Sequence, residues 1–164
     1  MGRHGMVGCM TYSPLHRANP TSITVTAGGT PVGTVANVVT MLDGDVYQIP
    51  ELAANPGFDV RFNFTGLSFL PDAIVSRTWY DGAHLVQLEL WDYVGSAFVV
   101  IDQIIPTDSY IIVETVFQPE ERFVSSGAAI VRYHHNQQGV AAQDIYWDYV
   151  SLWHRPFPPV TLYA

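Results

Sequence analysis

The feature that most constrains the fold is an alternation of apolar and polar residues with a period of two. In the segment Phe58–Phe64, four large apolar side chains alternate with polar or charged ones. Because neighbouring side chains of a β-strand point to opposite faces, this pattern predicts a strand with one buried face. Similar segments, rich in Val, Ile, Tyr, Phe and Trp, predict further strands at Ser22–Ala27, Gly33–Met41, Val46–Ile49, Ile74–Tyr80, His84–Trp91, Phe98–Ile104, Tyr110–Phe117, Ala128–His135 and Ile145–Trp153.

Turn-forming residues separate these segments. Asp81-Gly82 predicts a hairpin in which Trp79–Asp81 pairs with His84–Leu90, because Asp-Gly accepts the positive φ values of a type I′ turn. The helical pattern is limited to a short turn near Pro119–Arg122. Many strands, closely spaced turns and few helices predict an all-β fold, an antiparallel jelly-roll β-sandwich of about 8–10 strands.

The last predicted strand contains a change of phase. Ile145 and Trp147 share one face, whereas Val150 and Leu152 are apolar in the opposite phase. A β-bulge at Asp148-Tyr149 would bring both pairs to the core. One hypothesis is that the bulged Asp148 carboxylate helps to bind a structural Ca²⁺ with nearby backbone carbonyls. The alternative is that Asp148 caps the bulge or forms an ion pair with Arg132.

The ends of the chain differ in composition from the middle. Residues 1–20 carry Arg3 and Arg17 and no acid, which predicts an N-terminal arm that binds a partner or a sister subunit through these arginines. The predicted sandwich covers residues 21–154. Residues 155–164 predict a Pro-rich C-terminal tail, because its prolines cannot donate hydrogen bonds to a sheet.

The acidic charge of the chain limits its partners. All 7 basic residues are arginines, against 15 Asp and Glu, and the net charge is −8 at pH 7. No basic surface is predicted for phosphate backbones, so we expect no direct contact with nucleic acid. No apolar run approaches the ~20 residues of a membrane span, so we expect no membrane partner. The single cysteine permits no internal disulfide.

Two stretches carry a more specific pattern. One consists of Ile130–Asn136 followed by Gln143–Leu152, and the other, Arg77–Tyr93, combines a Tyr-Asp-Gly turn with a Trp-Asp-Tyr ending. They resemble the closing strands and the central hairpin of galactose-binding-like jelly-roll domains in bacteriophage virion proteins. The resemblance departs from that family at Gln143, where His is common, and at Trp147, where an aliphatic residue is usual. It implies a jelly roll in a virion.

No constellation of residues predicts catalysis. The sequence has no Gly-x-Ser-x-Gly motif, and its one cysteine, Cys9, lies in the predicted arm. His134 and His135 are adjacent on a predicted strand, so their side chains point to opposite faces and cannot share one metal ion. We therefore predict that the chain is not an enzyme and that, apart from the possible Ca²⁺, it has no cofactor.

Aromatic residues are the remaining candidates for a ligand or interface site. Flat rings can pack against the C–H faces of sugars, but a sandwich of this size also needs rings for its core and for subunit contacts. The candidates for a ligand site or a subunit interface are Trp79, Tyr80, Trp91, Tyr93, Tyr146 and Trp153.

Two functions follow. The first is a non-enzymatic phage structural protein, a capsid cement or decoration protein located on the virion after synthesis in the host cytoplasm. Its many apolar residues predict a homo-oligomer, with a trimer favoured, that binds the major capsid protein or other virion proteins. The alternative is a carbohydrate-binding module of a phage tail or fibre, which would bind a host glycan during adsorption.

Overall fold

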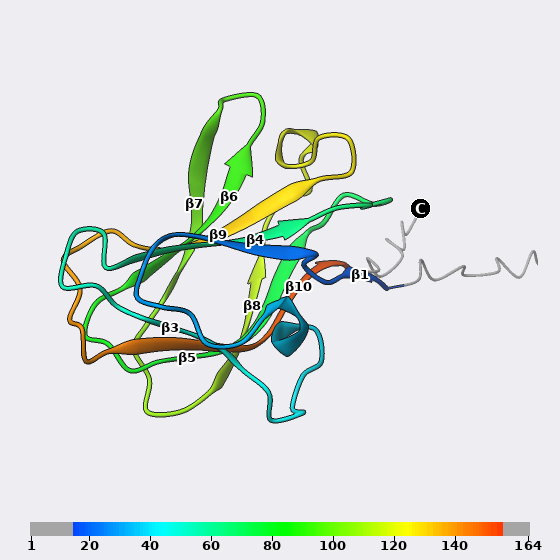
Figure 1. Cartoon of the computed structure of the whole chain (residues 1–164). Helices are drawn as coiled ribbons and strands as arrows, with labels where there is room; N and C mark the ends of the chain where they lie inside the picture. Colours follow the sequence, from blue (N-terminus) through cyan, green and yellow to red (C-terminus); the bar gives the residue numbers. More distant parts are fainter. Residues whose placement is uncertain (1–14, 156–164) are drawn as a thin grey trace, which may run out of the picture.

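Two antiparallel sheets pack face to face in the computed structural model, which describes residues 15–155 (Figure 1). Sheet A has the strand order β1-β10-β5-β8, with β3 also paired to β10, and sheet B has the order β2-β4-β9-β6-β7. Sheet A contains β1 (His16–Ala18), β3 (Tyr47–Pro50), β5 (Ala73–Tyr80), β8 (Ile111–Val116) and β10 (Asp144–His154). Sheet B contains β2 (Ser22–Ala27), β4 (Phe58–Phe64), β6 (Val86–Asp92), β7 (Ala97–Ile104) and β9 (Ala129–His135). The predicted all-β sandwich is confirmed.

One predicted strand is wrong. The segment Gly33–Met41 contains a short 3-10 helix, η1 (Val35–Val38), in place of a strand. The side chains of Thr34 and Asn37 form a capping box, in which the Thr34 backbone N–H donates to Asn37 Oδ1 at 2.7 Å. This local capping stabilises the helical turn despite the β-branched residues. The second 3-10 helix, η2 (Glu121–Phe123), lies at the predicted helical turn.

The predicted hairpin at Asp81-Gly82 is also wrong. β5 pairs with β10 and β8 in sheet A, whereas β6 pairs with β7 and β9 in sheet B. The turn therefore carries the chain from one sheet to the other. Asp81 Oδ1 accepts a hydrogen bond from the Asp144 backbone N–H at 2.6 Å, and Gly82 lies against the ring of Tyr80. The Asp-Gly pair therefore serves a turn between the two sheets, where Asp81 bonds to β10 and a side chain at Gly82 would collide with the Tyr80 ring.

The predicted arm boundary needs a correction as well. Strand β1 lies inside residues 1–20 and pairs with β10, where Arg17 is opposite Trp153. Arg17 is thus a residue of sheet A, whereas Arg3 lies outside the described residues, as do residues 156–164 of the predicted tail. Within the described range, no helix has the length and apolar character needed to cross a bilayer.

Trp147 on β10 is at the centre of the core. Its ring packs edge-on against Phe62 and Tyr133 of sheet B, with 5.3 Å between centroids in both pairs. Edge-to-face pairs at such distances add to the stabilisation from burial itself. Fully buried partners in this core include Phe58, Val60, Ile74, Leu88, Leu90, Val131, Ile145, Val150 and Leu152.

The bulge predicted in the last strand is confirmed. The register between β10 and β5 shifts between Trp147 and Tyr149, so Asp148 is the extra residue. Its Oδ2 accepts a hydrogen bond from the Leu42 backbone N–H at 2.8 Å and lies 2.9 Å from the Arg77 guanidinium. The proposed pairing with Arg132 is wrong, because Arg132 is on β9 in the other sheet.

Removing the Asp148 carboxylate should destabilise the fold. Asp148→Ala would leave the Arg77 charge without its partner and the Leu42 N–H without its acceptor. Breaking a buried ion pair costs about 3–5 kcal/mol, and since the Arg77 side chain is 22% exposed we expect about 2–3 kcal/mol. Urea denaturation measures this loss. The exposed Asp45→Ala is the control, and an equal loss in both variants would contradict the assignment.

Candidate functional site

Three aromatic residues form a row across the outer face of sheet A, the face turned away from sheet B. Tyr146 of β10 stacks on Trp79 of β5, with 4.6 Å between ring centroids and 12° between planes. Tyr110, directly before β8, packs edge-on against Trp79 at 5.8 Å. The three side chains are partly exposed. We call Trp79, Tyr110 and Tyr146 the aromatic row.

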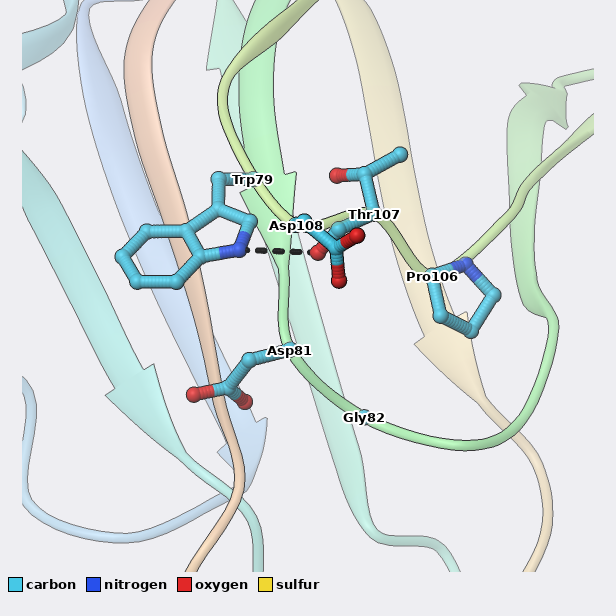
Figure 2. A pocket seen from close by; sticks show the side chains of 6 residues that line it. All are labelled: Trp79, Asp81, Gly82, Pro106, Thr107 and Asp108. Atoms are coloured by element: carbon cyan, nitrogen blue, oxygen red, sulfur yellow. Dashed lines mark hydrogen bonds between the residues drawn. The ribbon is translucent and has the colours of Figure 1, made fainter.

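A hollow of about 330 Å³ lies beside Trp79, the middle residue of this row. Figure 2 shows Trp79 and Pro106 on opposite sides of it, with Asp108 between them and the Asp81 carboxylate below the Trp79 ring. The Trp79 indole N–H donates to the Thr107 carbonyl at 3.0 Å, which fixes the ring against the loop between β7 and β8. The lining is completed by Gly82. We call this site the acidic hollow, because its charged groups are both carboxylates.

A second hollow, of about 430 Å³, lies farther along the same face. It is lined by Arg17, Val39, Thr40, Met41, Tyr149 and Trp153, and we call it the basic hollow. Trp153 is opposite Ala73, six residues along β5 from Trp79, which corresponds to about 20 Å at ~3.3 Å per residue. The two hollows therefore lie at opposite ends of one extended surface.

Two loops rise beside this surface. Figure 1 shows the loop between β7 and β8 and the loop after η1 projecting on the same side of β5 and β10, away from β4 and β9. The loop after η1 is held at two points: the Asn19 side chain donates to the Val39 carbonyl at 3.2 Å, and the Leu42 N–H donates to Asp148. The wall of the basic hollow is therefore fixed to sheet A.

Arg77 contacts both the aromatic row and the residue that holds the loop of the basic hollow. Its guanidinium lies over the Tyr110 ring, 4.3 Å from the centroid, while it also pairs with Asp148. The same contacts thus support the aromatic row and the loop at the basic hollow. Burial, together with the nearby charges of Asp144 and Asp81, raises the pKa of Tyr146 to about 12. Its hydroxyl therefore remains protonated at neutral pH and donates to the Asp144 carboxylate at 3.3 Å.

A buried polar cluster lies behind the acidic hollow. Tyr80 donates its hydroxyl proton to Glu51 Oε1, and Glu51 Oε2 accepts from the Val140 backbone N–H at 2.6 Å. His135 Nδ1 lies 3.0 Å from Glu51, and His84 stacks on the His135 ring at 4.9 Å. Tyr80 is fully buried, so the prediction that it contacts a ligand or a subunit is wrong.

The other predicted aromatics lie elsewhere. Trp91 packs against Phe98 on the outer face of sheet B, with 4.9 Å between the rings. Phe98 is also covered by two guanidinium groups, which belong to Arg61 and Arg132. Tyr93 is half-buried in the turn after β6, where its N–H donates to the Arg122 carbonyl. The aromatic residues predicted from the sequence therefore lie in four separate places: the outer face of sheet A, the buried cluster, the outer face of sheet B and the turn after β6.

The charged groups on the outer face of sheet B satisfy one another. Arg132 lies 2.8 Å from Asp59 and 3.1 Å from Glu89, and Asp59 also accepts from Arg61. Burial disfavours ionisation of Asp59, but the two arginines outweigh it and lower the pKa of this carboxyl. With its charges paired internally, this face offers less to a ligand than sheet A does.

Several site residues were not predicted from the sequence. Tyr110, Pro106, Thr107 and Asp108 come from one loop, and its turn-forming composition gave the only available signal. Among residues 15–155, no group of three or more His, Cys, Asp or Glu side chains is arranged to hold a metal ion. The Ca²⁺ hypothesis for Asp148 stays a prediction, and Arg77 already neutralises its carboxylate.

Solved structures of similar fold include family 29 carbohydrate-binding modules. A family 29 carbohydrate-binding module aligns with a TM-score of 0.62 and 10% identity, and the alignment covers 93% of this chain and 100% of that module. A family 29 module complexed with mannohexaose aligns at 0.57 and 10% identity, with 87% and 94% of the two chains covered. Another, complexed with cellulohexaose, aligns at 0.54 and 11% identity, with 82% and 94% covered.

These similarities establish the jelly-roll β-sandwich fold. At about 10% identity they establish the fold alone. No protein-family model matches the chain, and no curated protein sequence matches it either. Nothing in these comparisons links the chain to virion proteins, so the predicted capsid role, capsid partners and trimeric assembly stay predictions.

The buried cluster should make the fold sensitive to mild acid. Burial lowers the pKa of His135 below its ordinary value of 6.5, the charges of His84 and His134 lower it further, and Glu51 partly opposes them. Below about pH 6.5 the unfolded chain therefore binds a proton at this position more readily than the folded chain does. We expect the free energy of unfolding to fall as the pH is lowered from 7 to 5, measured by urea denaturation.

Two variants assign this effect. His135→Gln should flatten the dependence of stability on pH between 7 and 5. The control, His16→Gln at an exposed position, should leave this dependence unchanged. An unchanged slope in His135→Gln would show that another group is responsible.

Proposed function

We propose that the chain is a carbohydrate-binding module whose site is the outer face of sheet A. The observation that carries this proposal is the aromatic row next to the acidic hollow. Sugars present apolar C–H groups and hydroxyl donors together, and small-ligand sites typically combine apolar walls with a few well-placed polar groups. Here Trp79 and Pro106 supply the walls, and the carboxylates of Asp81 and Asp108 can accept from hydroxyls.

The geometry favours a bound chain of several sugars. Rings and hollows extend along β5 and β10 for about 20 Å, and loops rise beside both ends. The indole of Trp79 is fixed by Thr107 and Tyr146, so little side-chain entropy is lost on binding. The related modules complexed with mannohexaose and cellulohexaose support a glycan ligand for this fold.

The proposed role is binding and not catalysis. Asp81 is engaged by the Asp144 N–H, and Asp108 is on an exposed loop. Both residues are exposed to solvent, whereas the reacting groups of a closed active site are kept away from water. A glycan-binding role also agrees with the second function expected from the sequence.

Truncating Trp79 should remove glycan binding. We expect Trp79→Ala to weaken the binding of mannohexaose or cellohexaose about tenfold or more, because central aromatic contacts are typical binding hot spots. Isothermal titration calorimetry measures the affinity of both variants. Trp91→Ala is the matched control, since it also removes a partly exposed Trp packed against another ring, but on sheet B.

The outcome separates the two faces. Lost affinity in Trp79→Ala with retained affinity in Trp91→Ala supports the proposed site. The reverse result would assign binding to sheet B, and the absence of saturable binding to any oligosaccharide on a broad glycan array would refute the function.

A further inference from the structure

Arg17 differs from the other arginines that the structure describes. Within residues 15–155, each of the others lies within 4 Å of an Asp or Glu carboxylate: Arg61, Arg77, Arg122, Arg132 and Arg155. No such contact is found for Arg17, and residues 1–14 and 156–164 contain no Asp or Glu side chain. The chain therefore contains an arginine whose charge no acidic side chain of the described part compensates.

Arg17 lies where a ligand could use that charge. It is directly opposite Trp153 in the antiparallel pair of β1 and β10, so both side chains are on the outer face of sheet A. Both line the basic hollow, and no acidic residue lines it. Exposure of Arg17 keeps its guanidinium accessible.

The walls of the hollow around Arg17 are held in place by hydrogen bonds and strand pairing. Its loop wall is fixed by Asn19 at Val39 and by the Asp148 carboxylate at Leu42. Its opposite wall consists of Tyr149 and Trp153 on β10, a strand paired on both sides. The ring and the loop are therefore positioned before any ligand arrives, which lowers the entropic cost of binding.

We propose that the basic hollow binds a carboxylate-bearing sugar, a uronic acid residue of a glycan whose neutral part occupies the aromatic row. This inference rests on the proposed function and extends it to the class of glycan. A planar guanidinium matches a carboxylate in charge and in hydrogen-bond geometry. Trp153 offers the ring against which the sugar's C–H groups can pack.

The charge distribution indicates a glycan of mixed composition. The acidic hollow, with Asp81 and Asp108, would repel an anionic sugar. It lies about 20 Å from Trp153, beyond the Debye length of about 8 Å at physiological ionic strength. A uronic acid near Arg17 is therefore screened from it, whereas a polymer with a carboxylate on each sugar would meet both ends. We infer a ligand with neutral sugars at the acidic hollow and a uronic acid at the basic one.

The test compares ligands that differ by one carboxylate. Cellohexaose and mannohexaose are each compared with the same hexasaccharide oxidised at C6 of one terminal sugar, with both termini tried. Isothermal titration calorimetry is performed on the full chain at low and at physiological salt. We expect one acidic isomer to bind about tenfold more tightly than its neutral parent, with the advantage decreasing as salt increases.

Three variants assign the preference. Arg17→Gln should bind the acidic and the neutral hexasaccharide equally, and Arg17→Lys should retain part of the preference, since it keeps the charge without the planar fork. Arg61→Gln on sheet B is the control for loss of one positive charge and should keep the full preference. Thermal unfolding of each variant confirms that it is folded.

The outcomes distinguish this inference from the proposed function. Equal binding of acidic and neutral ligands by the unmodified chain, or a preference that survives in Arg17→Gln, overturns the basic hollow as a uronic acid site and leaves glycan binding intact. No binding of any hexasaccharide would overturn both proposals.

Discussion

The bulge at Asp148 is the constraint on which the rest of the structure depends. One extra residue in β10 lets Trp147 and Val150 both face the core, although their spacing in a regular strand would put them on opposite faces. The same residue supplies a buried carboxylate that pairs with Arg77 and holds the loop at Leu42. Core packing in sheet A and the wall of the basic hollow therefore arise from a single local irregularity.

The two outer faces of the sandwich differ in how their polar groups are arranged. On sheet B, Arg132 links Asp59 and Glu89 into a closed network. On sheet A, the aromatic row lies between a hollow with two carboxylates and a hollow with one arginine. A fold with two similar outer faces thus has one whose polar groups remain available to a ligand, and that asymmetry is the physical basis of the proposed function.

Periodicity predicted most strands and the bulge, because both depend on which residues of a segment must be buried. It could not predict sheet partners: Asp81-Gly82 has the local chemistry of a hairpin, yet Asp81 bonds to Asp144 of β10 and β6 belongs to the other sheet. Nor could it separate Trp79 from Tyr80, since inward-facing Ser76 and Thr78 hide the phase of β5. The acidic hollow joins this strand to the loop at Thr107, a proximity that no local pattern contains.

The four tryptophans allow the central claim to be measured directly. Trp79 and Trp153 line the two hollows of sheet A, Trp91 is on sheet B, and Trp147 is in the core. Two-dimensional NMR of ¹⁵N-labelled protein resolves the four indole N–H signals during titration with a hexasaccharide. Our account predicts saturable shifts of the Trp79 and Trp153 signals while those of Trp91 and Trp147 stay in place. Shifts confined to Trp91 would contradict it.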